Sequence, residues 1–235
     1  MQTTTTDLAA VLFDMDGTLV DSEKVWTIAL YELAERLGGR LSDGARAAMV
    51  GTNMSRSMVI LHEDLGLPLE DTAGSVAWLE ARMGELFAAG LVWRPGAADL
   101  LATVHAAGIP AALVTATRRR LTEKALQTIG PEFFAAVVCG DDIAETKPDP
   151  APYRHAAELL GVDPARCVAI EDSPTGLASA RGAGCVVLGV PSEVDLSGIE
   201  GVTLVDSLTE VDVDYLRALA ATGPGRPGSR ADAAR

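Results

Sequence analysis

Two aspartates separated by a single residue are the first feature of this sequence that could take part in chemistry. Asp14 and Asp16 follow the apolar run Val11–Phe13 and precede Gly17 and Thr18. In an extended backbone, residues two apart point to the same side, and carboxylates held so close repel each other. A shared cation, proton or phosphoryl group relieves that repulsion. The alternative is a strand-ending turn with two solvated acids, but this order of residues is a restrictive combination that favours a site.

Further polar residues follow later apolar runs. Thr115 ends the run at 109–115, Lys147 lies in the loop sequence ETKPDP, and Glu171 and Asp172 follow the run at 167–170. If these runs are parallel strands, such residues meet at the carboxyl edge of one sheet, where ligands bind. Taken singly, each has an ordinary explanation as a helix cap or a solvated loop charge. Their shared position at one edge favours a functional site.

Four carboxylates at one edge, without histidine or cysteine, match the oxygen ligands that Mg²⁺ prefers. The Lys147 charge, the Thr115 hydroxyl and nearby backbone N–H groups complete a receptor for a phosphate dianion. One carboxylate can attack phosphorus to form an aspartyl-phosphate, and a second can protonate the leaving oxygen. We therefore assign Asp14 as the nucleophile and Asp16 as the general acid and base.

The segments that must position these residues predict an α/β protein with an all-helical insertion. From residue 22 to residue 90, apolar residues recur at three- and four-residue spacing, which indicates helices without a convincing strand. After residue 94, short apolar runs alternate with helical segments, which is typical of a doubly wound, mainly parallel sheet. After the first, the expected strands are 109–115, 135–139, 167–170, 185–190 and 202–205.

This pattern divides the chain into three parts. We expect an α/β core of residues 1–20 and 92–221 and a helical cap of residues 21–91. The remaining segment, 222–235, is rich in glycine, proline and arginine, which predicts a disordered tail. We expect the cap to move, because water must be excluded and then admitted during such a reaction.

Composition and charge limit the kinds of molecule that this protein is expected to bind. The net charge of −14 disfavours nucleic acids and anionic membranes. No apolar run reaches membrane-spanning length, and the start MQTTTTDLAA lacks the pattern of a signal peptide. Cys139, Cys167 and Cys185 are scattered in apolar segments, which indicates buried thiols rather than disulfides or a zinc site. We expect a cytoplasmic monomer or weak dimer that binds a small phosphorylated metabolite, not nucleic acid or a membrane.

The order of the motifs resembles that of the haloacid dehalogenase superfamily over about residues 8–215. The motifs that resemble the family are DMDGT, which begins at Asp14, the strand end at Thr115, Lys147-Pro148, and EDSPTG, which begins at Glu171. The insertion resembles the helical cap of the subgroup with β-phosphoglucomutases and small-sugar phosphatases. The resemblance implies a Rossmann-like core and a cap that closes over the site. It implies a Mg²⁺ held by the Asp14 side chain, the Asp16 carbonyl and Asp172, with Glu171 close by, and phosphoryl oxygens held by Lys147 and Thr115.

Residues at the cap entrance bear on the reaction. Dehalogenases of this superfamily lack the second aspartate, so Asp16 favours phosphoryl chemistry. The β-phosphoglucomutases have a histidine at the place of Trp26, and DSEKVW resembles the opening of phosphatases that act on sugar phosphates. Relatives that cleave phosphonates need a cap lysine, and Lys24 is the only lysine before Lys124.

Four residues are predicted to bind substrate: Trp26, Arg56, Ala116 and Arg118. Trp26 also fits the apolar stripe of its helix, and a solvated helix start explains Arg56 equally well. The leading hypothesis is an enzyme, a Mg²⁺-dependent phosphatase of a small phosphorylated metabolite such as a sugar phosphate. The alternatives are a hexose-phosphate mutase and a non-catalytic ligand-binding domain with this fold. The complete set of motif residues argues against the latter.

Overall fold

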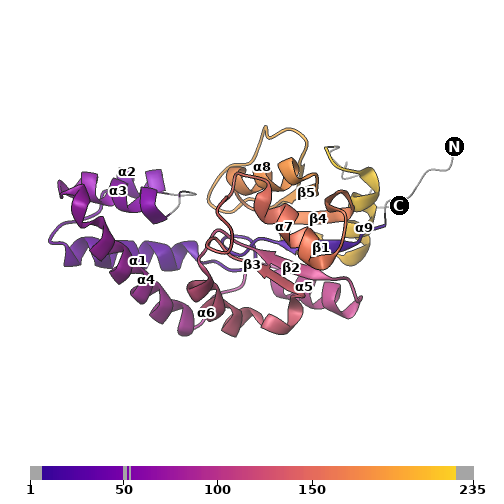
Figure 1. The fold of residues 1–235 in the computed structure, drawn as a ribbon, viewed down its shortest axis with the longest axis horizontal. Helices are drawn as coiled ribbons and strands as arrows, with labels where there is room; N and C mark the ends of the chain where they lie inside the picture. The colour runs from indigo at the N-terminus through magenta and orange to yellow at the C-terminus, as the bar shows by residue number, and fades with distance from the viewer. Residues whose placement is uncertain (1–6, 50–51, 53, 226–235) are drawn as a thin grey trace.

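In a computed structural model, which describes residues 7–49, 52 and 54–225, six strands form one parallel sheet (Figure 1). The strands are β1 (Ala10–Phe13), β2 (Ala111–Val114), β3 (Ala136–Val138), β4 (Cys167–Glu171), β5 (Val186–Gly189) and β6 (Thr203–Leu204). Their spatial order is β3-β2-β1-β4-β5-β6, so successive strands are added on one side of β1 up to β3 and on its other side from β4 onward. The predicted α/β fold class and parallel sheet are therefore confirmed.

Helices cover both faces of this sheet, which explains why β1 is apolar at every position. Val11 and Phe13 belong to one hydrophobic cluster, and Ala10 and Leu12 to another that includes Tyr153 of α7. All four strand residues have no exposed surface. The core helices are α5 (Ala97–Ala106), α6 (Arg119–Ile129), α7 (Ala151–Leu160), α8 (Pro174–Ala183) and α9 (Val213–Thr222). Short 3-10 turns lie at Leu69–Asp71, Pro131–Phe133, Pro164–Arg166 and Leu208–Glu210.

Helix α9 was not indicated by the sequence patterns that we used. Leu216, Leu219 and Ala220 are buried at helical spacing, and the Asp212 side chain caps the helix by accepting a hydrogen bond from Tyr215 N at 2.7 Å. The predicted tail at 222–235 begins at the last residue of α9, and positions 226–235 lie outside the described residues. No helix in the described part of the chain is long and apolar enough to cross a membrane.

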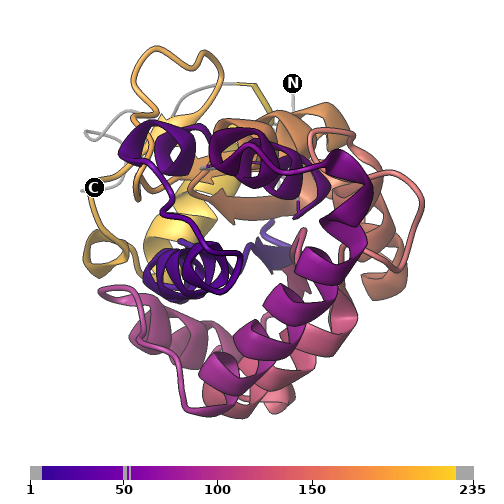
Figure 2. The same cartoon turned by 90° about the vertical axis from the view of Figure 1, so that its left-hand side faces the viewer.

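The segment between β1 and α5 forms a separate bundle of helices. These are α1 (Glu23–Arg36), α2 (Asp43–Met49), α3 (Met54–Leu65) and α4 (Thr72–Ala88). Position 50, which lies within the stretch of residues 22–90 that was predicted to be helical, is outside the described residues. Figures 1 and 2 show the bundle standing in front of the carboxyl edge of the sheet, with α4 next to α6 of the core. The helical character predicted for this insertion is confirmed.

Two linker segments join this bundle to the core, and they lie side by side. Val20 and Trp93 form an antiparallel bridge. Asp21 N donates to Val92 O at 2.8 Å, and Arg94 N donates to Leu19 O at 2.9 Å. These contacts pair the entry and the exit of the bundle immediately after the turn that follows β1. The cap boundaries at residues 21 and 91 remain a prediction.

Candidate active site

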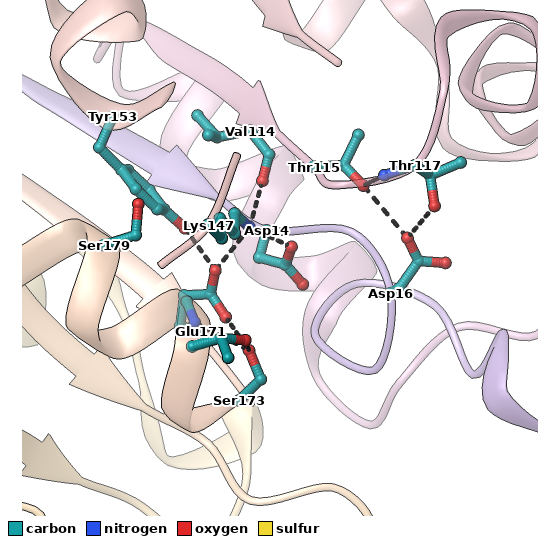
Figure 3. Close-up of polar contacts among 12 residues, drawn as sticks. Asp14, Asp16, Val114, Thr115, Thr117, Lys147, Tyr153, Glu171, Ser173 and Ser179 are labelled. Atoms are coloured by element: carbon teal, nitrogen blue, oxygen red, sulfur yellow. Dashed lines mark hydrogen bonds and ion pairs between the residues drawn. The ribbon is translucent and has the colours of Figure 1, made fainter. Parts of the chain in front are cut away.

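The predicted polar residues meet where the strand order reverses. Asp14 follows β1, Thr115 follows β2 and Glu171 ends β4, while Lys147 reaches the same edge from the loop before α7 (Figure 3). Asp14 is 5% exposed and Glu171 is fully buried. Burial of charged groups is costly unless they are paired, so these side chains are positioned by one another.

Lys147 lies at the centre of this group. Its Nζ donates to Asp14 Oδ1 at 2.6 Å, to Glu171 Oε1 at 2.6 Å and to Val114 O at 2.8 Å. These three acceptors use all three hydrogens of the ammonium group. Burial opposes its charge, but the Asp14 and Glu171 carboxylates raise the pKa of Lys147 above its ordinary value. Lys147 is therefore a fixed positive charge next to Asp14.

Glu171 is held from three sides by protein donors. Its Oε1 also accepts from the Tyr153 hydroxyl at 2.7 Å, and its Oε2 accepts from Ser173 Oγ at 3.1 Å. The Tyr153 ring also faces Lys147, with 5.2 Å between Nζ and the ring centroid. Burial, and then the Glu171 charge, raises the pKa of Tyr153, which keeps its hydroxyl protonated as a donor. The sequence reasoning missed Tyr153, whose place on the buried face of α7 is the only signal for it.

Asp16 points to a different set of groups. Ser22 Oγ donates to its Oδ1 at 2.6 Å, and the hydroxyls of Thr115 and Thr117 donate to its Oδ2 at 3.1 and 2.7 Å. Figure 3 shows Thr115 and Thr117 turned toward Asp16 and away from Lys147. The contact predicted between Thr115 and a phosphoryl oxygen stays a prediction. Ser22 and Thr117 were missed, because a lone hydroxyl residue gives no signal in sequence.

Gly17 allows the turn after β1 to approach β4 closely. Its φ is +79°, and a Cβ at this position would lie 2.0 Å from Asp172 Oδ2. Any other residue would be strained and would displace the carboxylate. The Asp-Gly-Thr order therefore serves to bring Asp172 next to Asp14 as well as to turn the chain.

Asp14, Glu171 and Asp172 form an oxygen-rich cluster that fits a divalent cation. Each offers one carboxylate oxygen within 4.8 Å of the other two. Burial, followed by the Glu171 charge, raises the pKa of Asp14 to about 7, and burial and Asp14 raise that of Asp172. No donor in the described residues contacts the Asp172 carboxylate, which faces the cavity below the cap. The oxygen ligands and the mutual repulsion of these three carboxylates suit a divalent cation such as Mg²⁺, and the Asp16 side chain lies outside the cluster.

A cavity of about 570 Å³ lies between the cap and the sheet edge, with Asp14, Asp16, Lys147 and Asp172 on its wall. The four residues predicted to bind substrate, Trp26, Arg56, Ala116 and Arg118, line the same cavity. Sequence reasoning missed four charged residues on this wall, namely Glu23, Arg46, Glu80 and Glu193. They come from α1, α2, α4 and the loop after β5, and no local motif connects them.

Comparisons with known proteins agree with this geometry. Residues 8–184 match the family model of haloacid dehalogenase-like hydrolases. The chain is 34% identical to protein CbbY of Rhodobacter capsulatus over 80% of its length and 87% of that protein. It is also 34% identical to hexitol phosphatase A of Escherichia coli, over 86% of this chain and 92% of that one. A crystal structure of a CbbY variant from Rhodobacter sphaeroides in complex with xylulose-(1,5)bisphosphate has a TM-score of 0.73 and 31% identity, covering 86% of this chain and 96% of that chain.

Proposed function

The chain belongs to the haloacid dehalogenase-like hydrolases and is a phosphatase of the sugar-phosphate type, and from this premise we propose its mechanism. It hydrolyses a small phosphorylated metabolite through an aspartyl-phosphate on Asp14, and it requires Mg²⁺. The observation that carries this proposal is the environment of Asp14. Lys147 holds its Oδ1, no described residue donates to its Oδ2, and the side chain borders the cavity.

In the first step, Asp14 Oδ2 attacks the phosphorus atom of the substrate. A bond forms between Oδ2 and phosphorus, the bond from phosphorus to the ester oxygen breaks, and Asp16 gives its proton to that leaving oxygen. The three hydroxyls around Asp16 fix the carboxyl group at the cavity wall. Lys147 places positive charge beside the transferring group, which is the main task of the protein in phosphoryl transfer.

In the second step, water replaces Asp14 on phosphorus. Asp16, now a carboxylate, takes a proton from the water molecule as its oxygen bonds to phosphorus. The bond from phosphorus to Asp14 breaks, inorganic phosphate leaves, and both aspartates return to their initial states. The cap must exclude water during the first step and admit it during the second, which the paired connection at Val20 and Trp93 would permit.

The residues that would hold Mg²⁺ are Asp14 and Asp172 through their side chains and Asp16 through its carbonyl, with Glu171 beside them. When bound, the ion supplies positive charge for the phosphoryl oxygens and orients them for in-line attack. The donor set supports this assignment because every candidate ligand is an oxygen atom. Glu171 contributes mainly by holding Lys147, since both of its oxygens already accept hydrogen bonds.

Release of phosphate from p-nitrophenyl phosphate tests this proposal directly. We expect Mg²⁺-dependent turnover that is lost in Asp14→Asn and in excess chelator. Asp214→Asn is a matched control, because the Asp214 side chain is 88% exposed on α9 and should leave turnover unchanged. Activity that survives in Asp14→Asn would contradict an aspartyl-phosphate on that residue.

The two alternatives are separated by their products. A hexose-phosphate mutase would convert β-glucose 1-phosphate to glucose 6-phosphate with little release of phosphate. Trp26 lines the cavity, and no described lining residue is a histidine, which supports phosphate hydrolysis over mutase activity. A binding domain would bind one ester tightly and turn over none. We further propose that the protein is cytoplasmic and that it is a monomer or a weak dimer. Light scattering of the purified protein would measure its oligomeric state.

A further inference from the structure

Beyond the phosphoryl site, the cavity wall carries a balanced set of charges. Three acidic and three basic residues occupy this part of the wall, which we call the outer wall: Glu23, Glu80, Glu193, Arg46, Arg56 and Arg118. Their formal charges sum to zero at neutral pH.

Arg46 is already engaged by neighbours on the outer wall. Its Nη2 donates to Glu23 Oε2 at 3.1 Å and to Thr27 Oγ1 at 2.6 Å, and it lies 3.7 Å from Glu193 Oε2. The Arg46 side chain is 12% exposed and that of Glu23 is 21% exposed. Burial, and then the charges of Glu193 and Asp16, raise the pKa of Glu23. Negative charge is therefore already in excess around this arginine.

Arg118 is similarly engaged on another part of the outer wall. Its Nη1 donates to Glu80 Oε1 of α4 at 2.8 Å. This pair and the contact between Arg46 and Glu193 each join the cap to the core. A second anionic group on the substrate would have to compete with a carboxylate for Arg46 or for Arg118. Separating such a pair leaves a partly buried charge without its partner, which costs binding energy.

From this arrangement we infer that the outer wall selects a monophosphorylated polyol whose remaining groups are uncharged. The inference rests on the proposed phosphatase function and adds the chemical class of the leaving group. Carboxylates accept hydrogen bonds from hydroxyls and arginines donate to them, so a balanced wall is satisfied by a neutral, hydroxyl-rich chain. The Trp26 side chain adds an apolar surface in the same cavity. The second anionic group of a bisphosphate or a phosphorylated sugar acid would lie close to the carboxylates of Glu23, Glu80 and Glu193, and like-charge contact is one way in which sites reject competing ligands.

Pairs of esters that differ in one charged group provide the test. Glucitol 6-phosphate and 6-phosphogluconate share a six-carbon chain, and fructose 6-phosphate and fructose 1,6-bisphosphate differ by one phosphate. With Mg²⁺ present, we expect kcat/KM for the neutral member to exceed that for its charged partner by about tenfold or more. The overall charge of −14 acts in the same direction.

Variants of opposite sign separate charge selection from a structural role. Glu193→Gln makes the outer wall more positive, so the preference for glucitol 6-phosphate over 6-phosphogluconate should shrink several-fold. Arg46→Gln makes the wall more negative, so the same ratio should grow. A residue that only supports the fold would lower kcat/KM for both esters equally. Glu158→Gln on α7, whose side chain is 81% exposed, is the matched control and should leave the ratio unchanged.

The outcomes distinguish this inference from the proposed function. Turnover of p-nitrophenyl phosphate that depends on Asp14, together with equal or better turnover of the charged esters, would overturn the inference and leave the phosphatase assignment intact. Ratios that move in the same direction in Glu193→Gln and Arg46→Gln would overturn it as well. Absence of turnover with every ester would overturn both.

Discussion

The Tyr153 hydroxyl donates to the same carboxylate oxygen of Glu171 that accepts from Lys147, at 2.7 and 2.6 Å respectively. Two donors on one oxygen fix the position of Glu171, and Glu171 in turn fixes the ammonium group beside Asp14. The Tyr153 ring lies against the same ammonium group. Tyr153 does not line the cavity and makes no hydrogen bond to the predicted nucleophile, so we expect it to affect turnover only through Lys147.

Tyr153→Phe removes this hydroxyl and keeps the ring. We expect kcat to fall about fivefold, the equivalent of one ordinary hydrogen bond, with KM nearly unchanged. Lys147 is one of three lysines, so its acetylation can be followed by mass spectrometry relative to Lys24, whose side chain is 79% exposed. A looser Lys147 should react faster in the variant. Tyr31→Phe in the cap is the control, and an unchanged kcat in Tyr153→Phe would contradict the role.

Removal of individual carboxylates should affect Mg²⁺ unequally. Asp172→Asn should raise the Mg²⁺ concentration for half-maximal activity by about 100-fold, because Asp172 has no described donor and faces the cavity. Glu171→Gln should raise it by about tenfold or less, because Glu171 is satisfied by Lys147, Tyr153 and Ser173. Calorimetric titration with Mg²⁺ measures the same difference without turnover. Equal weakening in both variants would make Glu171 an equal ligand.

The pKa of Asp14 predicts how pH affects stability without metal. Burial, and then Glu171, raise that pKa from 3.8 to about 7 in the folded chain. An acid whose pKa is higher when folded stabilises the protein fully below its unfolded pKa, and this stabilisation is lost as pH rises through the folded value. The metal-free protein should therefore lose stability relative to Asp14→Asn between about pH 4 and pH 7.

Thermal unfolding of both proteins measures this difference. In excess chelator, the Tm of wild type should fall below that of Asp14→Asn as pH rises. Mg²⁺ at 100 times its Kd should raise the wild-type Tm near neutral pH by about 5–10 °C and should have less effect on the variant. A Tm difference that does not change with pH would show that Asp14 does not titrate in this range.

Closure of the cap can be tested at the Glu80–Arg118 pair. Glu80→Cys combined with Arg118→Cys allows a cleavable bismaleimide to join α4 to the loop after β2, and the native cysteines are buried. Cross-linking should reduce turnover by about tenfold or more, because water and product must pass the cap in each cycle. Reductive cleavage of the linker should restore turnover, and the two single variants are controls. Full activity in the linked protein would exclude gating by this motion.

The strands and the catalytic motifs could be predicted because their signals are local. Val11–Phe13 is apolar at each position since both faces of β1 are covered, and such a run is visible without any partner. Asp14, Lys147 and Asp172 follow or lie between such runs, and the topology of parallel sheets then brings them to one edge. Helix α9 carries local signals of the same kind, namely the helical spacing of Leu216, Leu219 and Ala220 and the Asp212 cap, but it was not predicted.

The amino-acid sequence by itself determined the α/β class, the helical insertion and the chemical types gathered at the sheet edge, because periodicity and short motifs encode these. Only the tertiary structure decided that Asp16 is held by Ser22, Thr115 and Thr117, and that Tyr153 supports Glu171. It alone placed Arg46 between Glu23 and Glu193. These contacts join different elements of the fold, and their partners are set by tertiary packing, which no local pattern records.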